Sequence, residues 1–277
     1  MKYDYYIAMP TRGRVNKQST LQRLRPEIRK MVNVYCHPGE IDLFKKLYSD
    51  QVASIQEYDK DCTHIGEIRE YILFNSNSKN VIFMDDNLRF QSRNVPRDTS
   101  LKSNIFEMTP KNYSEEELLN MQIEIFDWMF TSLEKYAMCG LSFRPFNRNI
   151  KEEIVENCRL FAFWEINVEK YLKQPQRFSD WALKEDFAVS ISLIREGFDV
   201  VCNFKYAFDK SSGANTKGGC SNYRTVNRNN EFALRLQKEF PDVVTLKEKE
   251  RKNWHGEFEG VKSLDVIIKW SKIKFTK

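Results

Sequence analysis

Two adjacent carboxylates, Asp85 and Asp86, directly follow the apolar run VIFM, and Asn87 comes next. The run is typical of a buried strand, so both acids are expected where that strand ends. Neighbouring like charges repel each other unless a positive group lies beside them. A divalent cation that bridges two phosphates is such a group, because carboxylate oxygens suit Mg²⁺ or Mn²⁺. The alternative is a solvated turn, since Asp and Asn both favour turns.

Cationic side chains follow the first apolar run of the chain. The stretch AMPTRGR offers a hydroxyl from Thr11 and guanidinium groups from Arg12 and Arg14. Guanidinium groups pair well with phosphates, so this stretch is suited to holding a nucleotide. Its plainer interpretation is a basic surface turn. Arg69, in GEIREYIL, is a further cation, and an ordinary amphipathic helix would account for it equally well.

Two more acids and a histidine come later in the chain. Glu185 and Asp186 begin a predicted helix, where the helix dipole favours carboxylates, and either is placed to take a proton from an acceptor hydroxyl. His255, in NWHGEF, is either a ligand that reaches back to a metal or a structural histidine. The stretch SSGANTKGGC is interpreted as a substrate loop or an ordinary surface loop.

The elements that position these groups alternate along the first ninety residues. The apolar spacing predicts strands at 5–9 (ended by Pro10), 31–36, 51–58 and 80–84. It predicts helices at 19–31, 39–48 and 63–76, the last capped by Thr63 with Glu67. Such alternation predicts a parallel sheet covered by helices, which binds ligands beyond the carboxyl ends of its strands. The acid pair follows one such end.

The remaining chain continues this pattern less regularly. It predicts helices at 114–137, 183–197 and 229–240, a long strand at 157–172 and a further strand at 198–204. We find neither an internal repeat nor a low-complexity segment. The chain is therefore interpreted as one domain, with the nucleotide-binding end first.

Composition excludes several classes of protein. The chain has 277 residues, 41% of them hydrophobic and 30% charged, and its net charge of +5 permits a polyanionic partner without requiring one. Six Cys form no CxxC pair and only three His occur, so we expect no structural zinc and infer a reducing, cytoplasmic setting. No signal peptide and no run of about 18 apolar residues is found, so no membrane partner is expected.

Taken in order, these stretches resemble the GT-A type glycosyltransferases from residue 5 to about residue 205. The resemblance implies an α/β fold with a GT-A-like, Rossmann-like and mostly parallel sheet flanked by helices. It implies nucleotide-sugar binding by Pro10, Thr11, Arg12, Arg14, Gly66, Arg69 and Asp85. It implies metal binding by Asp86, Asn87 and His255, and catalysis by Asp186 and Glu185. Many members carry a carboxylate where this chain has Asn87, which places strict dependence on Mg²⁺ or Mn²⁺ in doubt.

A finer resemblance is to phage glycosyltransferases related to those associated with TET/JBP enzymes. It is carried by PTRGR, GLSFRPFNRN, LKEDFAVSISLIREGFDV and the pair Gly218 and Gly219, and it implies acceptor binding by Arg144, Asn147 and that glycine pair. Such a protein would move glucose or arabinose from a UDP-sugar to 5-hydroxymethylcytosine in double-stranded DNA, in the host cell cytoplasm. The single domain, 1–277, would then comprise a nucleotide-sugar-binding half, 1–110, and an acceptor-binding half, 111–277.

The resemblance leaves the mechanism and the acceptor open. If transfer inverts the anomeric carbon, Asp186 is the base, and if it retains the configuration, Asp186 orients the acceptor. A DNA acceptor would require a flipped base and phosphate contacts, for which the sequence offers Tyr223, Phe143, Phe146 and the basic stretches NYRTVNR, KEKERKNWH and KWSKIKFTK. The alternatives are a polysaccharide, lipid or protein acceptor, or a non-catalytic module that binds nucleotides or DNA.

Overall fold

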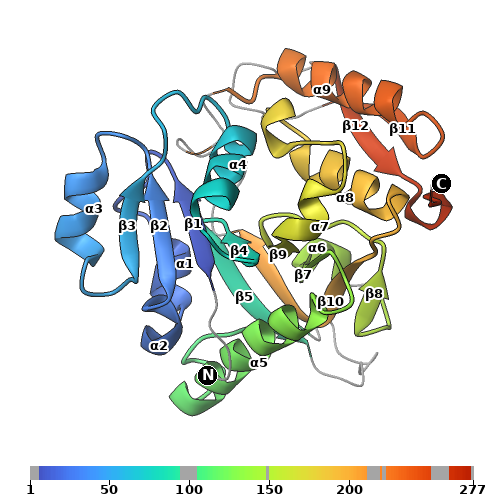
Figure 1. Cartoon of the computed structure of the whole chain (residues 1–277). Coiled ribbons are helices and arrows are strands. Elements are labelled where there is room, and N and C mark those ends of the chain that lie inside the picture. The colour runs from blue at the N-terminus through green and yellow to red at the C-terminus, as the bar shows by residue number, and fades with distance from the viewer. Residues whose placement is uncertain are drawn as a thin grey trace.

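A mixed sheet of 10 strands forms the centre of the computed structural model (Figure 1). The structure describes residues 6–93, 105–147, 150–210, 219, 223–250 and 262–275. The strand order is β3-β2-β1-β4-β9-β7-β10-β5-β6, and β8 pairs with β10. The segments on either side of residue 110 share this sheet, since β5 pairs with β10.

The strands of the sheet are β1 (Ile7–Thr11), β2 (Val32–Cys36), β3 (Ser54–Glu57), β4 (Asn80–Met84), β5 (Leu88–Arg93), β6 (Ile105–Glu107), β7 (Met138–Phe143), β8 (Ile154–Glu156), β9 (Phe163–Asn167) and β10 (Val200–Lys210). A second, two-stranded sheet consists of β11 (Val244–Glu250) and β12 (Lys262–Ile268). The helices are α1 (Ser19–Arg23), α2 (Pro26–Arg29), α3 (Ile41–Tyr48), α4 (Ile65–Asn75), α5 (Glu115–Ser132), α6 (Arg144–Asn147), α7 (Val168–Leu172), α8 (Glu185–Arg195) and α9 (Val226–Glu239), with 3₁₀ turns η1 (Phe178–Asp180) and η3 (Trp270–Lys272).

Most strands of the large sheet run in one direction. β1 is parallel to β2 and β4, and β2 is parallel to β3. β9 is antiparallel to both β4 and β7, and β10 is parallel to β7, so β4, β7 and β10 also run the same way. Their carboxyl ends therefore lie at one edge, the edge at which a sheet of this kind binds ligands. The expected mostly parallel sheet in a single domain is confirmed.

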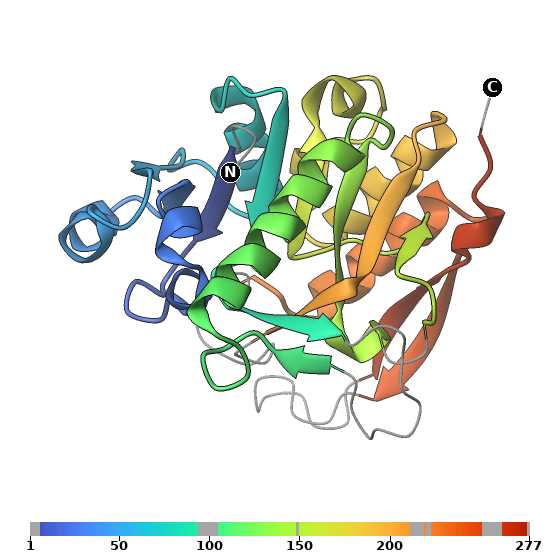
Figure 2. The ribbon, with the colours of Figure 1, turned by 90° about the horizontal axis from the view of Figure 1, so that it is seen from below.

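Alternate residues of the strands face two separate cores. On β4, Val81 and Phe83 pack with the apolar sides of α4 and α8, whereas Ile82 and Met84 pack with those of α1 and α5. Figure 2 shows α5 lying across its face of the sheet. Because β4 is covered on both faces, its run of apolar residues is continuous rather than alternating.

Proline changes two of the expected boundaries. β1 continues through Pro10 to Thr11, since its pairing with β4 is confined to Ile7 and Ala8 and the absent N–H of Pro10 lies beyond it. The expected helix 19–31 is two helices, because Pro26 begins α2 and Arg25 before it is extended.

Side-chain capping changes two further boundaries of the expected elements. The expected strand 157–172 is instead β9 followed by α7, because the Asn167 side chain accepts a hydrogen bond from Lys170 N and begins a helix. His64 rather than Thr63 caps α4, although Glu67 completes the capping interaction as expected. The capping box of Ser114 and Glu117 at the start of α5 is confirmed.

Candidate active site

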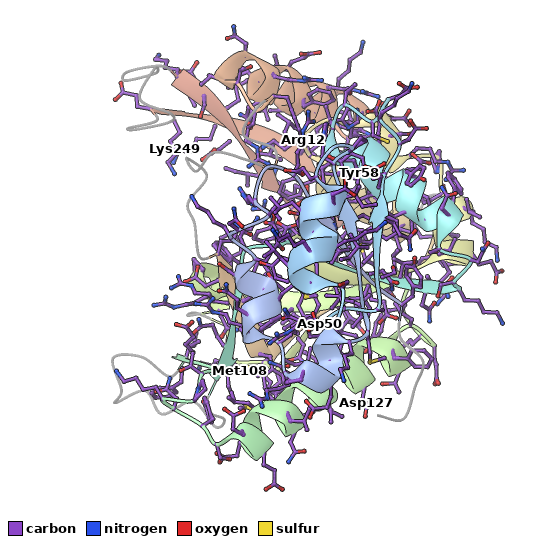
Figure 3. The ribbon with its side chains drawn as sticks, turned by 90° about the vertical axis from the view of Figure 1, so that its left-hand side faces the viewer. Arg12, Asp50, Tyr58, Met108, Asp127 and Lys249 are labelled. Carbon is purple, nitrogen blue, oxygen red and sulfur yellow. The ribbon has the colours of Figure 1, made fainter. Side chains whose placement is uncertain are left out.

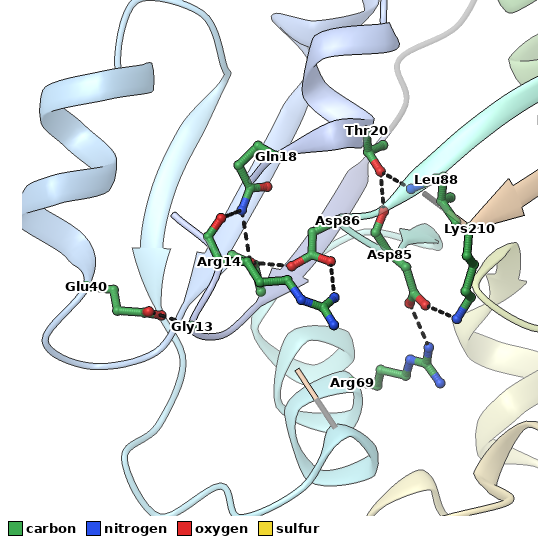
Figure 4. Close-up of polar contacts among 11 residues, drawn as sticks. Gly13, Arg14, Gln18, Thr20, Glu40, Arg69, Asp85, Asp86, Leu88 and Lys210 are labelled. Carbon is green, nitrogen blue, oxygen red and sulfur yellow. Dashed lines mark hydrogen bonds and ion pairs between the residues drawn. The ribbon is translucent and has the colours of Figure 1, made fainter. Parts of the chain in front are cut away.

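Asp86 joins the end of β1 to the turn after β4. Thr11 donates its hydroxyl to Asp86 Oδ2 at 2.7 Å, and Arg14 Nη1 donates to Oδ1 at 2.7 Å (Figure 4). Asp86 is 3% exposed, and this burial raises the pKa of its carboxyl against the opposing effects of Arg14 and Thr11. Both oxygens of Asp86 are therefore held by donors from the segment around the end of β1.

Asp85 contacts a different pair of cations. Lys210 Nζ, at the carboxyl end of β10, donates to Asp85 Oδ2 at 2.9 Å, and Arg69 Nη2 lies 3.5 Å from Oδ1 (Figure 4). Burial raises the pKa of Asp85, but Lys210 and Arg69 outweigh it and the net pKa is lowered. Asp85 is thus an ionised carboxylate between two cations, and with its side chain 25% exposed a ligand can reach it.

The beginning of α1 fixes the turn that carries both acids. Thr20 Oγ1 donates to the carbonyl of Asp85 at 2.6 Å and accepts from Leu88 N at 2.8 Å, while Thr20 N donates to the carbonyl of Asp86 at 3.2 Å. Gln18 Nε2 donates to the Thr11 hydroxyl at 3.1 Å. The acids therefore sit on a backbone whose polar groups are satisfied from a second element, which keeps their side chains in place.

Arg69 links the acid pair to Glu185. Its Nη1 donates to Glu185 Oε1 at 2.5 Å while Nη2 reaches Asp85, and the guanidinium lies 5.2 Å from the ring centroid of Trp164. Burial raises the pKa of Glu185, and Arg69 opposes that effect. The planar guanidinium thus bridges a carboxylate after β4 and one at the start of α8, each through a different nitrogen.

Asp186 lies at the start of α8 with a looser partner. Its Oδ2 is 3.8 Å from Arg159 Nη2. Lys184, which precedes the pair, has a φ of 70°, a left-handed conformation that costs energy for a residue with a Cβ. Burial lowers the pKa of Lys184 to about 8. Strained backbone conformations are common at active sites, which agrees with the predicted catalytic role of Glu185 and Asp186.

An aromatic platform, which we define as Phe143, Phe146 and Phe161, lies beside these acids. The ring of Phe143 is 5.5 Å from that of Phe146 and 5.2 Å from that of Phe161. Arg159 Cζ is 4.3 Å from the Phe161 centroid, and Lys210 Nζ is 5.7 Å from the same ring. Phe146 is 48% exposed. The platform therefore connects the partner of Asp186 with the partner of Asp85 and leaves one ring open to solvent.

Three of the predicted nucleotide-binding residues lie outside this network of carboxylates. Pro10 is inside β1, and the carbonyl of Arg12 accepts a hydrogen bond from Gly219 N at 2.8 Å. Figure 3 shows Arg12 beside Tyr58; burial raises the pKa of that phenol and Arg12 opposes the rise. Gly66 packs α4 onto η1, because a Cβ there would lie 2.0 Å from the carbonyl oxygen of Phe178.

The predicted acceptor residues are dispersed. Arg144 Nη1 pairs with Asp209 Oδ2 at 3.0 Å, next to Lys210 in sequence. Asn147 is 1% exposed, and its amide donates to Ser142 Oγ and to the Phe204 carbonyl, contacts that hold α6 against the sheet. The structure thus gives Asn147 a structural role.

Of the predicted residues Gly218, Gly219 and His255, the structure describes Gly219. Gly219 has a φ of 58°, and a Cβ there would lie 3.3 Å from Arg14 Nη2, so a glycine allows this close approach to the site. Gly218 and His255 lie outside the described residues.

The predicted metal ligands do not form a site for a divalent cation among the described residues. Both oxygens of Asp86 and both of Asp85 face N–H or O–H donors, and Asn87 is buried. Across the described ranges, no group of three or more His, Cys, Asp or Glu side chains is arranged to hold a metal ion. A Mg²⁺ or Mn²⁺ ion at Asp85 would have to displace Lys210 or Arg69, so the described residues, which do not include His255, do not fit a resident dication as they are arranged.

Lys210 and Arg159 are the functional candidates that sequence reasoning missed. Lys210 ends a strand that runs to the same sheet edge as β4, and a search of every strand end for charged side chains would have found it. Nothing in the sequence around Arg159 marks it, because its contacts with Asp186 and with the ring of Phe187, 4.4 Å away, depend on the tertiary structure.

The chain has matches both to a family model and to solved structures. A family model described as TET-Associated Glycosyltransferase matches residues 5–219. The first 349 residues of TarS from S. aureus superpose with a TM-score of 0.44 and 10% identity, covering 85% of this chain and 66% of that one. Glucosyl-3-phosphoglycerate synthase from Mycobacterium tuberculosis, with Mn²⁺, UDP and glucosyl-3-phosphoglycerate, superposes with a TM-score of 0.46 and 10% identity, covering 90% and 86%. No curated protein matches.

Family membership accounts for the organisation of the site. The matched range contains the acid pair, Arg69, the start of α8 and Lys210, so the contacts described above lie within it. The expected GT-A-like fold and the enzyme class are confirmed together. No helix in the described ranges combines the length and the apolarity needed to cross a membrane. The chain belongs to the TET-associated glycosyltransferase family, and it is a glycosyltransferase.

Proposed function

We propose that this enzyme transfers glucose or arabinose from a UDP-sugar to the hydroxyl of 5-hydroxymethylcytosine in double-stranded DNA. The observation that carries the donor side is the cluster of Arg14, Arg69 and Lys210 at the carboxyl edge of the sheet. Diphosphates are bound by such clusters, because guanidinium and ammonium groups donate to phosphate oxygens and offset their charge. Asp85, reachable by solvent among these cations, is placed to accept from a sugar or ribose hydroxyl.

Transfer would break the bond between the anomeric carbon and the β-phosphate oxygen. The electron pair passes to that oxygen, and the acceptor hydroxyl oxygen forms the new bond to the anomeric carbon. For inversion, Asp186 takes the hydroxyl proton; for retention, Asp186 orients the acceptor and the proton leaves with the phosphate. In either role Asp186 has a cationic neighbour, since Arg159 Nη2 lies 3.8 Å from its Oδ2.

The acceptor side is supported by the aromatic platform and its cation. A pyrimidine flipped out of a duplex needs a ring to stack on and a positive group near its phosphate. Phe146 offers an exposed ring, and Arg159 lies 5.8 Å from its centroid and close to Asp186. The hydroxymethyl group of a base stacked there would lie on the side of the predicted base, Asp186.

The test is incubation with a panel of UDP-sugars and a duplex that contains 5-hydroxymethylcytosine, read by mass spectrometry of the released nucleosides. We expect one hexose or pentose added to the modified nucleoside, none on a duplex with ordinary cytosine, and no product with Asp186→Asn if transfer inverts. The proposed acceptor is wrong if the nucleosides stay unmodified while a polysaccharide or protein acceptor receives the sugar.

A further inference from the structure

Three cations from three separate segments converge on the acidic edge of the sheet. Arg14 follows β1, Arg69 belongs to α4 and Lys210 ends β10. Their partners are the three carboxylates Asp86, Asp85 and Glu185, which these contacts hold within 3.5 Å. Figure 4 shows the contacts of Asp85 and Asp86. Three positive and three negative groups cancel, so the local charge is close to zero before any ligand binds. A diphosphate that reaches this edge would find hydrogen-bond donors already assembled.

The contacts of the acid pair favour cationic side chains over a metal ion. Hard dications take oxygen ligands at short distances, and Mg²⁺ is usually held by one or two carboxylates together with water and substrate phosphates. Here Arg14 Nη1 lies 2.7 Å from Asp86 and Lys210 Nζ lies 2.9 Å from Asp85, so each acid already has a cationic partner. Asn87 adds an uncharged amide in place of a third acid.

Lys210 is the cation of the three that a ligand reaches most easily. Its side chain is 33% exposed, compared with 15% for Arg14 and 5% for Arg69. It ends a long strand, and its Nζ donates a hydrogen bond to Asp85, whose side chain solvent can reach. A flexible ammonium of this kind can turn from a carboxylate to a phosphate oxygen without moving the backbone.

We propose that Lys210, supported by Arg69, offsets the charge that grows on the leaving diphosphate, so that transfer needs no divalent cation. The inference rests on the proposed nucleotide-diphosphate-sugar donor. As the bond from the anomeric carbon to the β-phosphate oxygen breaks, its electron pair stays on that oxygen, and Lys210 Nζ donates a hydrogen bond to it. Asp85 holds Lys210 in place before the donor arrives. Lys210 is therefore a catalytic residue that contacts the leaving group.

The experiment combines chelation with variants of Lys210. UDP binding is measured by calorimetry and transfer by product mass, each in excess EDTA and in excess MnCl₂. For the wild type we expect binding and rate to agree within about twofold between the two conditions. Lys210→Ala should lower kcat about 100-fold, the usual scale for a lost leaving-group donor, and Mn²⁺ should not restore it. Lys210→Arg should recover a large part, because it keeps the charge.

A matched control lies on the same strand. Lys205, also on β10, pairs with Glu124 and its side chain is 37% exposed, so Lys205→Ala removes an equivalent charge without touching the acid pair. It should leave rate and UDP affinity unchanged. Melting temperatures of all variants establish that the Lys210 effects arise in folded protein.

Three outcomes would overturn the inference, and they are distinguishable. If UDP binding and transfer disappear in EDTA and return with Mn²⁺, the donor assignment stands and the metal-free mechanism is wrong. If UDP fails to bind in either condition, the proposed donor is wrong and the inference falls with it. A Lys210→Ala variant with wild-type kcat in EDTA would also contradict it.

Discussion

The two sides of the site differ in how tightly their charged groups are held. On the donor side, Asp86 is bonded at 2.7 Å to both Thr11 and Arg14, and Glu185 is bonded at 2.5 Å to Arg69. On the acceptor side, Asp186 is 3.8 Å from Arg159, and Phe146 is half exposed. A preorganised donor side suits one small, highly charged ligand, whereas an open acceptor side suits a bulky one that brings its own contacts.

The largest expected effect comes from breaking the donor side at Arg69. Arg69→Ala leaves Glu185 buried without its cation and removes a partner of Asp85. We expect a loss of about 1,000-fold in kcat/KM from the lost charge stabilisation. We also expect about 3 kcal/mol lower stability, the usual cost of breaking a buried ion pair. Steady-state kinetics and thermal unfolding measure the two effects.

Arg195 is the control for that variant. Arg195 is the last residue of α8 and pairs with Asp242, whose side chain is 60% exposed. Arg195→Ala should change stability by less than about 0.5 kcal/mol, because exposed ion pairs contribute little. Near-normal activity in Arg69→Ala would show that the donor side is not preorganised by this residue.

Breaking the acceptor side at Arg159 should have a smaller and different effect. Arg159→Ala removes the cation beside Asp186 and its contact with the ring of Phe161. We expect kcat/KM for DNA to fall about 100-fold while the Kd for UDP stays constant. Arg235 provides the control, since it lies 4.3 Å from the Trp181 ring without contacting the acid pair. An equal loss of UDP affinity would place Arg159 on the donor side instead.

Removing the exposed ring of Phe146 should weaken the acceptor side alone. Phe146→Ala should raise KM for DNA about tenfold, the scale of one lost base stack, and should leave kcat and the melting temperature nearly unchanged. Phe146→Tyr should retain the wild-type KM. Phe74, 55% exposed on α4, is the matched control for loss of a surface ring. If the KM for DNA is unchanged in Phe146→Ala, the aromatic platform does not bind the acceptor.

The smallest effect on activity is expected from Glu165, a buried acid that belongs to neither the donor side nor the acceptor side of the site. Glu165 on β9 is 1% exposed, and burial raises its pKa to about 8. Its carboxyl favours folding fully below the unfolded pKa of about 4.5, and that contribution is lost as the pH rises toward 8. Glu165→Gln should therefore raise the melting temperature at pH 8 by roughly 5 °C and leave it unchanged at pH 4.

The exposed Glu231→Gln is the control for this pH comparison. It makes the same chemical change on the surface of α9 and should shift the melting temperature at neither pH. A Glu165→Gln variant that is less stable than the wild type at pH 8 would show that the ionised carboxylate is needed there.

Local signals were sufficient for much of the fold. The apolar run before Asp85 predicted β4, and Ser114 with Glu117 predicted the beginning of α5. These predictions succeeded because a buried strand and a capping box depend on residues within a few positions of each other. Two boundaries were predicted wrongly because a local signal interrupts a longer apolar pattern. Pro26 begins a new helix within the predicted helix 19–31, and Asn167 caps a helix within the predicted strand 157–172.

The partners of the acids could not be predicted in the same way. Lys210 meets Asp85 only because β10 reaches the same sheet edge as β4, and the strand order is fixed by packing on both faces of the sheet. Arg69 was predicted to bind the nucleotide, but its bond to Glu185 joins residues 116 positions apart. The sequence therefore indicated which residues carry charge, while the fold determines which charges neutralise each other.

The most direct measurement of the central claim is a crystal structure of the protein with UDP, grown with EDTA. The claim is that the acidic edge beyond β1, β4 and β10 receives a diphosphate through Arg14, Arg69 and Lys210. We predict phosphate oxygens within hydrogen-bonding distance of Lys210 Nζ and of at least one of the two guanidinium groups. A UDP molecule bound elsewhere, with Lys210 still on Asp85 and that edge holding only water, would contradict the claim.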